Sequence, residues 1–167
     1  MLELTLEQGF GKTSVREILE RAEVARSTFY AHFKDKDDLL LGGFTLFQLQ
    51  PVKEDPTDGS LPLPELGRIF SHVGLNLDLF QALQAGGDLP GPLNQARRDL
   101  ECSYQVVFED LIVRGYALSG EPPLLATFFA GALMAVLVDW LERGVPETPE
   151  VMAERFQNMV QRGARAS

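Results

Sequence analysis

The chain has 167 residues, of which 45% are apolar, and its formal net charge is −9 at pH 7. This length allows one substantial hydrophobic core, or a small N-terminal unit joined to a larger body. The acidic balance argues against a protein that binds nucleic acid through overall positive charge, because Lys and Arg supply most non-specific affinity for phosphates.

The N-terminal segment predicts two helices separated by a turn. Residues 2–8 have the pattern of the end of a helix, which Gly9 terminates. Ser14 followed by Glu17 forms a capping-box pattern at the start of the second helix, with Thr13 as a competing cap. Apolar residues at helical spacing predict one buried face on this helix: Val15, Ile18, Leu19 and Ala22.

A third helix is predicted over residues 25–32, after a short turn at Glu23-Val24. Two short helices joined by a turn of three or four residues are typical of a helix-turn-helix unit. Phe29 and Phe33 lie on the inner side of this helix, so its opposite side is expected to face solvent. Residues 26–36 contain three basic residues and one acidic residue, which makes a locally positive surface on an acidic protein.

The exposed side of the third helix has residue types that read DNA. Arg26 suits bidentate hydrogen bonding to guanine in the major groove, and the short side chains of Ser27 and Thr28 allow the helix to approach base edges. Residue types that hold phosphates, and so fix the register on DNA, lie around this group: Thr13, Tyr30, His32 and Lys36. Spacing alone leaves a second interpretation open, in which the Arg-Ser-Thr run is a solvated helix start.

The remaining chain predicts a connecting helix, a loop and a helical body. The connecting helix opens at Asp35 or Lys36 and has apolar residues at Leu39, Leu40, Phe44 and Phe47. Residues 51–64 are rich in Pro, Asp, Glu, Gly and Ser, which is typical of a loop. Prolines and caps then open helices over residues 64–85, 92–114, 122–143 and 148–164. Since no segment alternates apolar and polar residues over strand-like lengths, the expected fold class is all-α.

One apolar segment raises the question of a membrane. Pro122 to Val138 is seventeen residues long without a charge, whereas a spanning helix needs roughly 20. A helix covered by its own domain and by a second subunit is therefore expected. Cys102 is the single cysteine, and the N-terminus lacks a signal-peptide pattern, so we expect a cytoplasmic protein with no membrane contact, no metal and no cofactor.

Three blocks within residues 9–44 follow a known order and spacing: Thr13-Ser-Val, Thr28-Phe-Tyr-Ala-His-Phe and Lys36-Asp-Asp-Leu-Leu. They resemble the DNA-binding headpiece of TetR-family transcriptional regulators. The resemblance implies a helix-turn-helix domain at residues 1–44, with a truncated first helix, and a helical effector-binding and dimerisation domain at residues 45–167. It also implies base readers and phosphate contacts at Thr13, Ser14, Arg26, Ser27, Thr28, Tyr30, His32 and Lys36.

Three features depart from the family pattern. The family's first helix normally begins further upstream than Met1, often with basic residues that touch DNA. Glu23 stands where the family usually has glycine; a side chain in a left-handed conformation there costs roughly 1 kcal/mol, and its carboxylate repels phosphate. Ala25 replaces a common serine and removes one helix cap. We therefore expect an N-terminally extended form to bind DNA more tightly in a binding titration.

The resemblance also implies a ligand cavity and a dimer interface in the C-terminal domain. Residues 121–143 and 148–164 are expected to form a four-helix bundle across a two-fold axis, although the same residues also suit the core of one domain. The candidate interface residues are Phe129, Leu133, Val136, Trp140, Phe156 and Met159. The candidate pocket residues, each of which also suits a plain core, are Phe70, His72, Phe80, Tyr104, Phe108 and Phe128.

The leading hypothesis is a homodimeric repressor that binds a palindromic DNA operator and responds to an unidentified small-molecule effector. The alternative is a degenerate relative that forms the dimer and binds a ligand but has lost DNA binding, which Glu23 and the acidic balance favour. An enzyme is disfavoured, because the chain has two histidines and one cysteine and lacks hydrolase, phosphate-loop and metalloprotease motifs.

Overall fold

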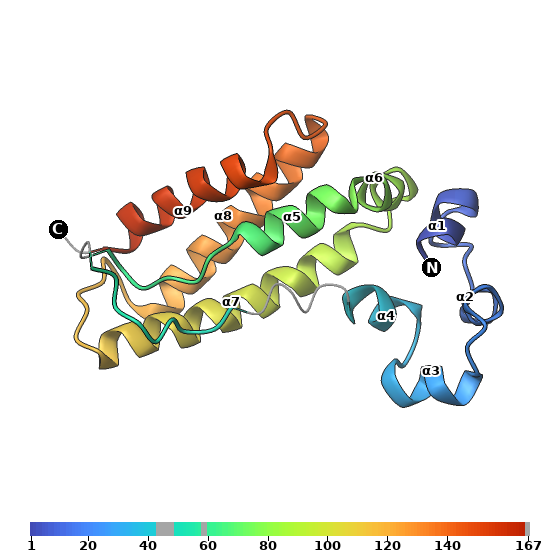
Figure 1. The fold of residues 1–167 in the computed structure, drawn as a ribbon, viewed down its shortest axis with the longest axis horizontal. Helices are drawn as coiled ribbons and strands as arrows, with labels where there is room; N and C mark the ends of the chain where they lie inside the picture. Colours follow the sequence, from blue (N-terminus) through green and yellow to red (C-terminus); the bar gives the residue numbers. More distant parts are fainter. Residues whose placement is uncertain (43–48, 58–59, 166–167) are drawn as a thin grey trace. The chain divides into compact units, whose positions relative to one another are not determined.

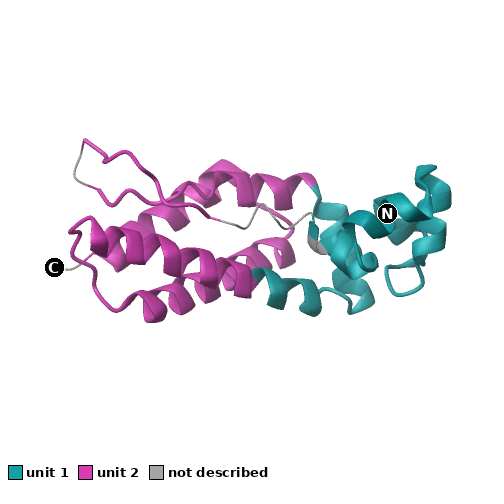
Figure 2. Cartoon of the chain, turned by 90° about the horizontal axis from the view of Figure 1, so that it is seen from below, with its two compact units in different colours: residues 1–45, 76–96 teal, residues 46–75, 97–167 magenta. Residues whose placement is uncertain are grey.

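The computed structural model describes residues 1–42, 49–57 and 60–165, and within these ranges the chain is helical and contains no β-strand. The predicted all-α class is confirmed. Phe44 and Phe47 lie outside the described residues. The chain forms two compact units, one from Met1–Thr45 with Asn76–Ala96 and the other from Leu46–Leu75 with Arg97–Ser167 (Figure 2). Residues 76–96 thus group with the N-terminal segment, and not with the residues on either side of them.

The N-terminal unit consists of short helices around a small apolar core. It contains α1 (Leu2–Gln8), α2 (Val15–Ala22), α3 (Arg26–His32), α4 (Lys36–Gly42), α6 (Leu77–Gly86) and the start of α7 (Figure 1). Helix α6 packs against α1. The buried side chains come from all of these helices and include Leu4, Ile18, Phe29, Leu40, Phe80 and Leu83. A headpiece of this size therefore uses a segment from the middle of the chain to complete its core.

Local signals predicted the ends of α1 and α2 correctly. Gly9 ends α1 with φ 87°, a conformation that favours glycine. Ser14 caps α2 through a capping box, in which the Ser14 backbone N–H donates to the Glu17 carboxylate at 2.8 Å and the Glu17 N–H donates to Ser14 Oγ at 3.3 Å. The predicted burial of Ala22 is wrong: Ala22 is exposed, because it lies in the last turn beside the open end of the helix.

The single helix predicted over residues 64–85 is interrupted. Helix α5 spans Gly67–Leu75 and α6 spans Leu77–Gly86, with Asn76 between them at φ −115° and ψ 28°. The two halves have different partners, since α5 packs on α9 and α6 packs on α1. The break therefore coincides with the boundary between the two compact units. The predicted end of α6 is confirmed, because Gly87 adopts φ 76° and closes the last turn.

The larger unit holds the end of α7 (Pro90–Val113), α5, α8 (Pro122–Glu142) and α9 (Pro149–Ala164). Helices α5 and α9 lie side by side (Figure 1). By length and composition α8 meets the requirement for a membrane-spanning helix, with a mean hydropathy of 2.0 over its most apolar window, but half of that window is buried within the protein. Its buried residues include Phe129, Leu133, Leu137 and Trp140, which is the pattern of a core helix.

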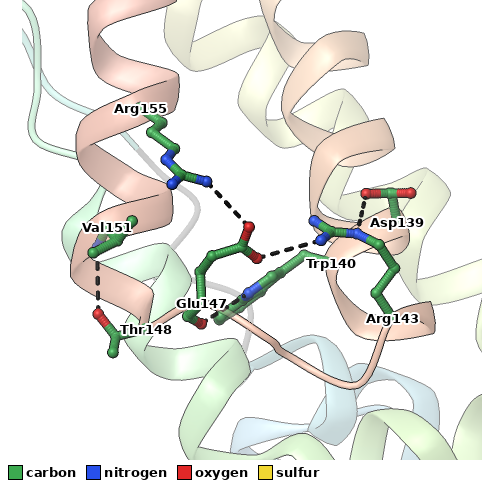
Figure 3. A network of polar contacts seen from close by, with 7 residues as sticks. All are labelled: Asp139, Trp140, Arg143, Glu147, Thr148, Val151 and Arg155. Atoms are coloured by element: carbon green, nitrogen blue, oxygen red, sulfur yellow. Dashed lines mark hydrogen bonds and ion pairs between the residues drawn. The ribbon is translucent and has the colours of Figure 1, made fainter.

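The turn between α8 and α9 is held by a polar network (Figure 3). The Trp140 indole N–H donates to the Glu147 backbone carbonyl at 3.1 Å. The Glu147 carboxylate lies between Arg143, at 3.4 Å, and Arg155, at 3.1 Å. The Thr148 hydroxyl oxygen accepts the Val151 backbone N–H and caps α9, as predicted. The network ties the fully buried Trp140 ring to the start of α9.

Replacing Trp140 with phenylalanine is expected to lower the free energy of unfolding by about 1–2 kcal/mol, since it leaves the Glu147 carbonyl without its donor and opens a small void beside Phe70. Urea unfolding followed by far-ultraviolet circular dichroism measures this change, because Trp140 is the single tryptophan and its fluorescence is lost in the variant. An unchanged unfolding midpoint contradicts a structural role for the indole hydrogen bond.

Candidate nucleic-acid interface

Helix α3 leaves its polar side open to solvent. Within the chain, the predicted reading side chains and their neighbours are all exposed: Arg26, Ser27, Thr28, Tyr30 and His32. On the inner side, Phe29 is 5% exposed and its ring centroid lies 5.6 Å from that of Phe33. The aromatic side therefore anchors the helix in the headpiece, and no other part of the described chain covers its polar side.

Arg26 is held against an aromatic ring on the same helix. Its guanidinium carbon lies 5.6 Å from the centroid of the Tyr30 ring, one helical turn away. Cation–π contacts of this kind are modest in solvent. They nevertheless restrict a long side chain, so less conformational entropy is lost when that side chain binds a partner. Arg26 is thus partly ordered on the outer surface of α3.

Thr13 and Lys36 point inward and fasten the loop between α1 and α2. Thr13 is 2% exposed, and its hydroxyl donates to the Gly9 carbonyl at 2.9 Å. The Lys36 ammonium donates to the carbonyls of Phe10, at 2.6 Å, and Gly11, at 3.2 Å, and lies 4.5 Å from the centroid of the Phe10 ring. Both side chains are engaged in the headpiece, so their predicted phosphate contacts require other groups to move.

The cations of the headpiece divide into paired and unpaired groups. Arg21 bridges the α1 carboxylates of Glu3, at 3.1 Å, and Glu7, at 3.0 Å, and Arg16 pairs with Glu20. Across the described residues, the other cations of this unit have no carboxylate partner: Lys12, Arg26, Lys34 and Lys36, of which Lys36 is bonded to backbone carbonyls. Lys12 and Lys34 were not among the predicted DNA contacts. Their positions in the sequence, two residues before the Ser14 cap and two residues after the end of α3, could have indicated them.

The turn before α3 is strained at Glu23. This residue adopts φ 53° and ψ 37°, the left-handed conformation, and its backbone N–H closes the end of α2. Glu23 therefore has the left-handed conformation in which a side chain is strained. Ala25 begins α3 without a side-chain cap, also as expected. The helix-turn-helix thus carries one strained residue and lacks one cap at the point where its two helices meet.

Replacing Glu23 with glycine is expected to raise the free energy of unfolding of the headpiece by about 1 kcal/mol, because glycine adopts this conformation without steric cost. Thermal unfolding of the full chain measures the effect. Glu23→Gln is the matched control, since it removes the charge and keeps the strain, and it should leave the stability nearly unchanged. Equal stabilisation by both variants would show that charge, and not backbone strain, is the cause.

The predicted pocket residues belong to two different compact units. Phe80 lies on α6 in the N-terminal unit, whereas the others belong to the larger unit. There, Phe70 packs edge-on against Trp140 at 5.6 Å, and Tyr104 stacks on Phe108 at 5.7 Å. His72 is half-buried, and desolvation lowers the pKa of its imidazole. Phe128 is 63% exposed on the surface of α8, so it does not line an interior cavity of the subunit.

The Tyr104 hydroxyl is a buried polar group without a partner among the described residues. Burial raises the pKa of this hydroxyl and keeps it neutral. Buried hydroxyls are rarely unsatisfied, and this one lies beside Phe108 and Phe129. Among the predicted pocket residues, the Tyr104 hydroxyl is therefore the group best suited to bind a ligand.

Most of the predicted interface residues face the core of the larger unit. Phe129, Leu133, Trp140 and Phe156 are at most 3% exposed. Phe129 lies so close to Gly163 of α9 that a Cβ there would be 3.1 Å from its ring. Val136 is half-buried, and Met159 is 54% exposed. Met159 lies on the flank of α9, whereas Phe156 faces the core.

Comparisons with known proteins agree for both parts of the chain. Residues 2–42 match the family model for bacterial regulatory proteins of the tetR family, and residues 94–162 match a model for a transcriptional regulator C-terminal region. A search of the curated proteins found no match.

Two solved structures share the fold. A protein from Syntrophomonas wolfei, assigned to the TetR-family transcriptional regulators, is 21% identical, with a TM-score of 0.57 over 95% of this chain and 88% of that one. NalD, the secondary repressor of the MexAB-OprM multidrug efflux pump in Pseudomonas aeruginosa, is 21% identical, with a TM-score of 0.52 over 99% of this chain and 93% of that one. The N-terminal helix-turn-helix and the C-terminal helical region both match models of transcriptional regulators. The chain therefore belongs to the TetR family and is a DNA-binding transcriptional regulator.

Proposed function

We propose that the chain is a cytoplasmic, non-enzymatic repressor that binds a palindromic operator as a homodimer and responds to a small molecule. The observation that carries this proposal is the open polar side of α3, on which Arg26, Ser27 and Thr28 are exposed together. A helix presented in this way enters the major groove, where Arg26 reads guanine and the two short side chains allow close approach.

The phosphate contacts are proposed for the exposed groups around α3. Ser14 caps the N-terminus of α2, where backbone N–H groups attract an anion, and Tyr30 and His32 flank the reading side chains. Lys12 and Lys34 add two unpaired cations on either side. Thr13 and Lys36 support these contacts by holding the loop before α2 in place.

The dimer is proposed to form through α8 and α9. Helix α8 exposes Leu124 at 68% and Phe128 at 63%, and exposed Ala135 and half-buried Gly131 continue the same side at helical spacing. On α9, Met159 is 54% exposed. A large exposed apolar surface with small residues suits close packing of two helices across a two-fold axis. The two α3 helices must then reach major grooves about 34 Å apart.

Repression and induction are linked if an effector favours a dimer in which the two α3 helices no longer match the grooves. The coupling is reciprocal, so operator DNA must weaken effector binding by the same factor. Footprinting of the purified dimer on DNA upstream of its own gene tests the function. Protection of a palindromic sequence supports it, and the absence of protection on any promoter fragment contradicts it.

A second function is favoured by Glu23, whose carboxylate lies at the turn before α3 of an acidic protein. In that case the chain forms a dimer and binds a ligand without DNA. Gel-shift titrations against genomic fragments separate the two: specific retardation supports the repressor, and none at micromolar protein supports the degenerate relative.

A further inference from the structure

A small pocket lies between α2 and α3 in the N-terminal unit. It has a volume of about 230 Å³ and is lined by Val15, Arg16, Leu19, Arg26 and Tyr30. Two of these residues, Arg26 and Tyr30, lie on α3 and are exposed there. The pocket therefore borders the open polar side of the helix that is presented to DNA.

The wall that α2 contributes to this pocket is apolar and only partly covered. Val15 and Leu19 are one helical turn apart, so they lie on the same side of α2. Sequence periodicity predicted both as buried, together with Ile18. Ile18 is 4% exposed, whereas Val15 and Leu19 are half-buried. The headpiece thus leaves part of an apolar surface uncovered beside its reading helix.

The opposite wall of the pocket consists of an aromatic ring and a cation. The Tyr30 side chain is 48% exposed, and the guanidinium carbon of Arg26 lies 5.6 Å from the centroid of its ring. A second cation, Arg16, pairs with Glu20 at 3.1 Å, but their side chains are 84% and 64% exposed. An ion pair between such exposed groups is weak, so a phosphate can replace the Glu20 carboxylate. The two arginines give the apolar pocket the charge that suits an occupant carried by a polyanion.

Thymine is the DNA base whose groove edge fits this combination of walls. Each base presents its own pattern of donors and acceptors in the major groove, and thymine alone of the four adds a methyl group there. Successive bases of a strand are about 3.4 Å apart along the helix axis. The base next to a guanine bound by Arg26 therefore places its edge beside the guanidinium, where the pocket begins.

We propose that the pocket receives the 5-methyl group of a thymine adjacent to the guanine that Arg26 reads. The inference rests on the proposed function, because it adds a second base to the same recognition surface. The methyl group packs against Val15 and Leu19, and the faces of Arg26 and Tyr30 enclose it. Cytosine leaves the pocket empty, whereas 5-methylcytosine fills it. The chain therefore distinguishes methylated from unmethylated pyrimidines at one position of each half-site.

The test uses the duplex protected in the footprinting experiment, and copies in which one symmetric pair of thymines is replaced by deoxyuridine. This replacement removes the methyl group and keeps every hydrogen-bonding group of the base. Burial of one methyl-sized group changes affinity about four-fold, so two half-sites together give about fifteen-fold. Fluorescence anisotropy should show this loss for one pair of thymines, whereas the other pairs stay within about two-fold of the unmodified duplex.

The position of the sensitive thymine is part of the expected result. The guanine read by Arg26 is the one whose replacement by 7-deazaguanine weakens binding of the original chain but not of Arg26→Ala, since 7-deazaguanine lacks the N7 acceptor. The sensitive thymine should be its neighbour. When both copies of this thymine are replaced by cytosine, a 5-methyl group on the cytosines should recover about fifteen-fold in affinity.

The variant Leu19→Ala tests the apolar wall. It should bring the affinities for the thymine and deoxyuridine duplexes to within about three-fold of each other, because the methyl group loses most of its contact surface. A general loss of headpiece stability leaves this ratio unchanged, since both duplexes are measured with one protein. The matched control is Leu6→Ala, which removes the same atoms from a residue that is 49% exposed on α1, outside the pocket, and should keep the original ratio.

The outcomes separate this inference from the proposed function. Equal binding of all deoxyuridine copies, a sensitive thymine away from that guanine, or a ratio that Leu19→Ala leaves unchanged overturns the methyl contact while the repressor function stands. Absence of any protected duplex overturns the proposed function, and the inference fails with it.

Discussion

Replacing Phe128 with aspartate is expected to convert the homodimer into monomers. Phe128 is 63% exposed in the single chain, near the middle of the apolar side of α8. At a two-fold interface each substitution acts twice, and a central aromatic residue contributes roughly 2 kcal/mol or more per copy. The dissociation constant should therefore rise by about three orders of magnitude. Sedimentation velocity at micromolar protein measures the change in oligomeric state.

The matched control for this experiment is Val113→Asp. Val113 lies at the end of α7 and is 86% exposed, so it offers the same change in charge at an apolar surface residue outside the proposed interface. It should leave the dimer intact. Because both positions are exposed within the subunit, neither variant should lose stability as a monomer. A Phe128→Asp chain that remains dimeric would place the interface elsewhere.

Replacing Arg26 with alanine is expected to abolish specific recognition of the operator. A bidentate contact with guanine contributes about 1–3 kcal/mol of discrimination, and a dimer on a palindrome makes it twice. Operator affinity should therefore fall at least about thirty-fold. Affinity for unrelated DNA should fall far less, because only the phosphate-dependent part of binding remains. Fluorescence anisotropy with both duplexes at a fixed salt concentration measures the two affinities.

Arg68→Ala provides the comparison for Arg26→Ala. Arg68 is an exposed arginine on α5, in the larger unit, and its loss changes net charge by the same amount. Operator affinity should stay within a few-fold of the original chain. If the two variants lose affinity equally, the effect of Arg26 is a general electrostatic one, and another side chain reads the bases. If Arg26→Ala weakens both duplexes equally, Arg26 holds a phosphate.

Several details of the headpiece were predictable because short-range interactions determine them. The capping box of Ser14 and Glu17 involves residues three positions apart, and the end of α1 depends on the left-handed conformation of Gly9. The strain at Glu23 was expected from the family resemblance, because glycine usually stands at this position of the turn, and the structure has a positive φ there. Arg26, Ser27 and Thr28 were found from local spacing, since the inner aromatic side of α3 determines which side remains open.

Other predictions failed because burial depends on a partner that the sequence does not identify. The apolar pattern of residues 64–85 is helical throughout, yet the helix breaks at Asn76, and its halves pack on α9 and on α1. The engagement of Thr13 and Lys36 by carbonyls of the loop between α1 and α2 also depends on tertiary contacts, and their phosphate contacts stay a prediction. Aromatic residues at helical spacing on α8 did not reveal that Phe129 faces the core and Phe128 faces solvent.

By itself, the sequence determined the helical class, most helix ends, the helix-turn-helix and the residues on the open side of α3, because caps, turns and amphipathic spacing act within a few residues of each other. Only the tertiary structure decided which apolar side of α8 is left exposed and where α6 packs. Those features arise from contacts between segments far apart in the chain, and their energies depend on how completely each surface is covered.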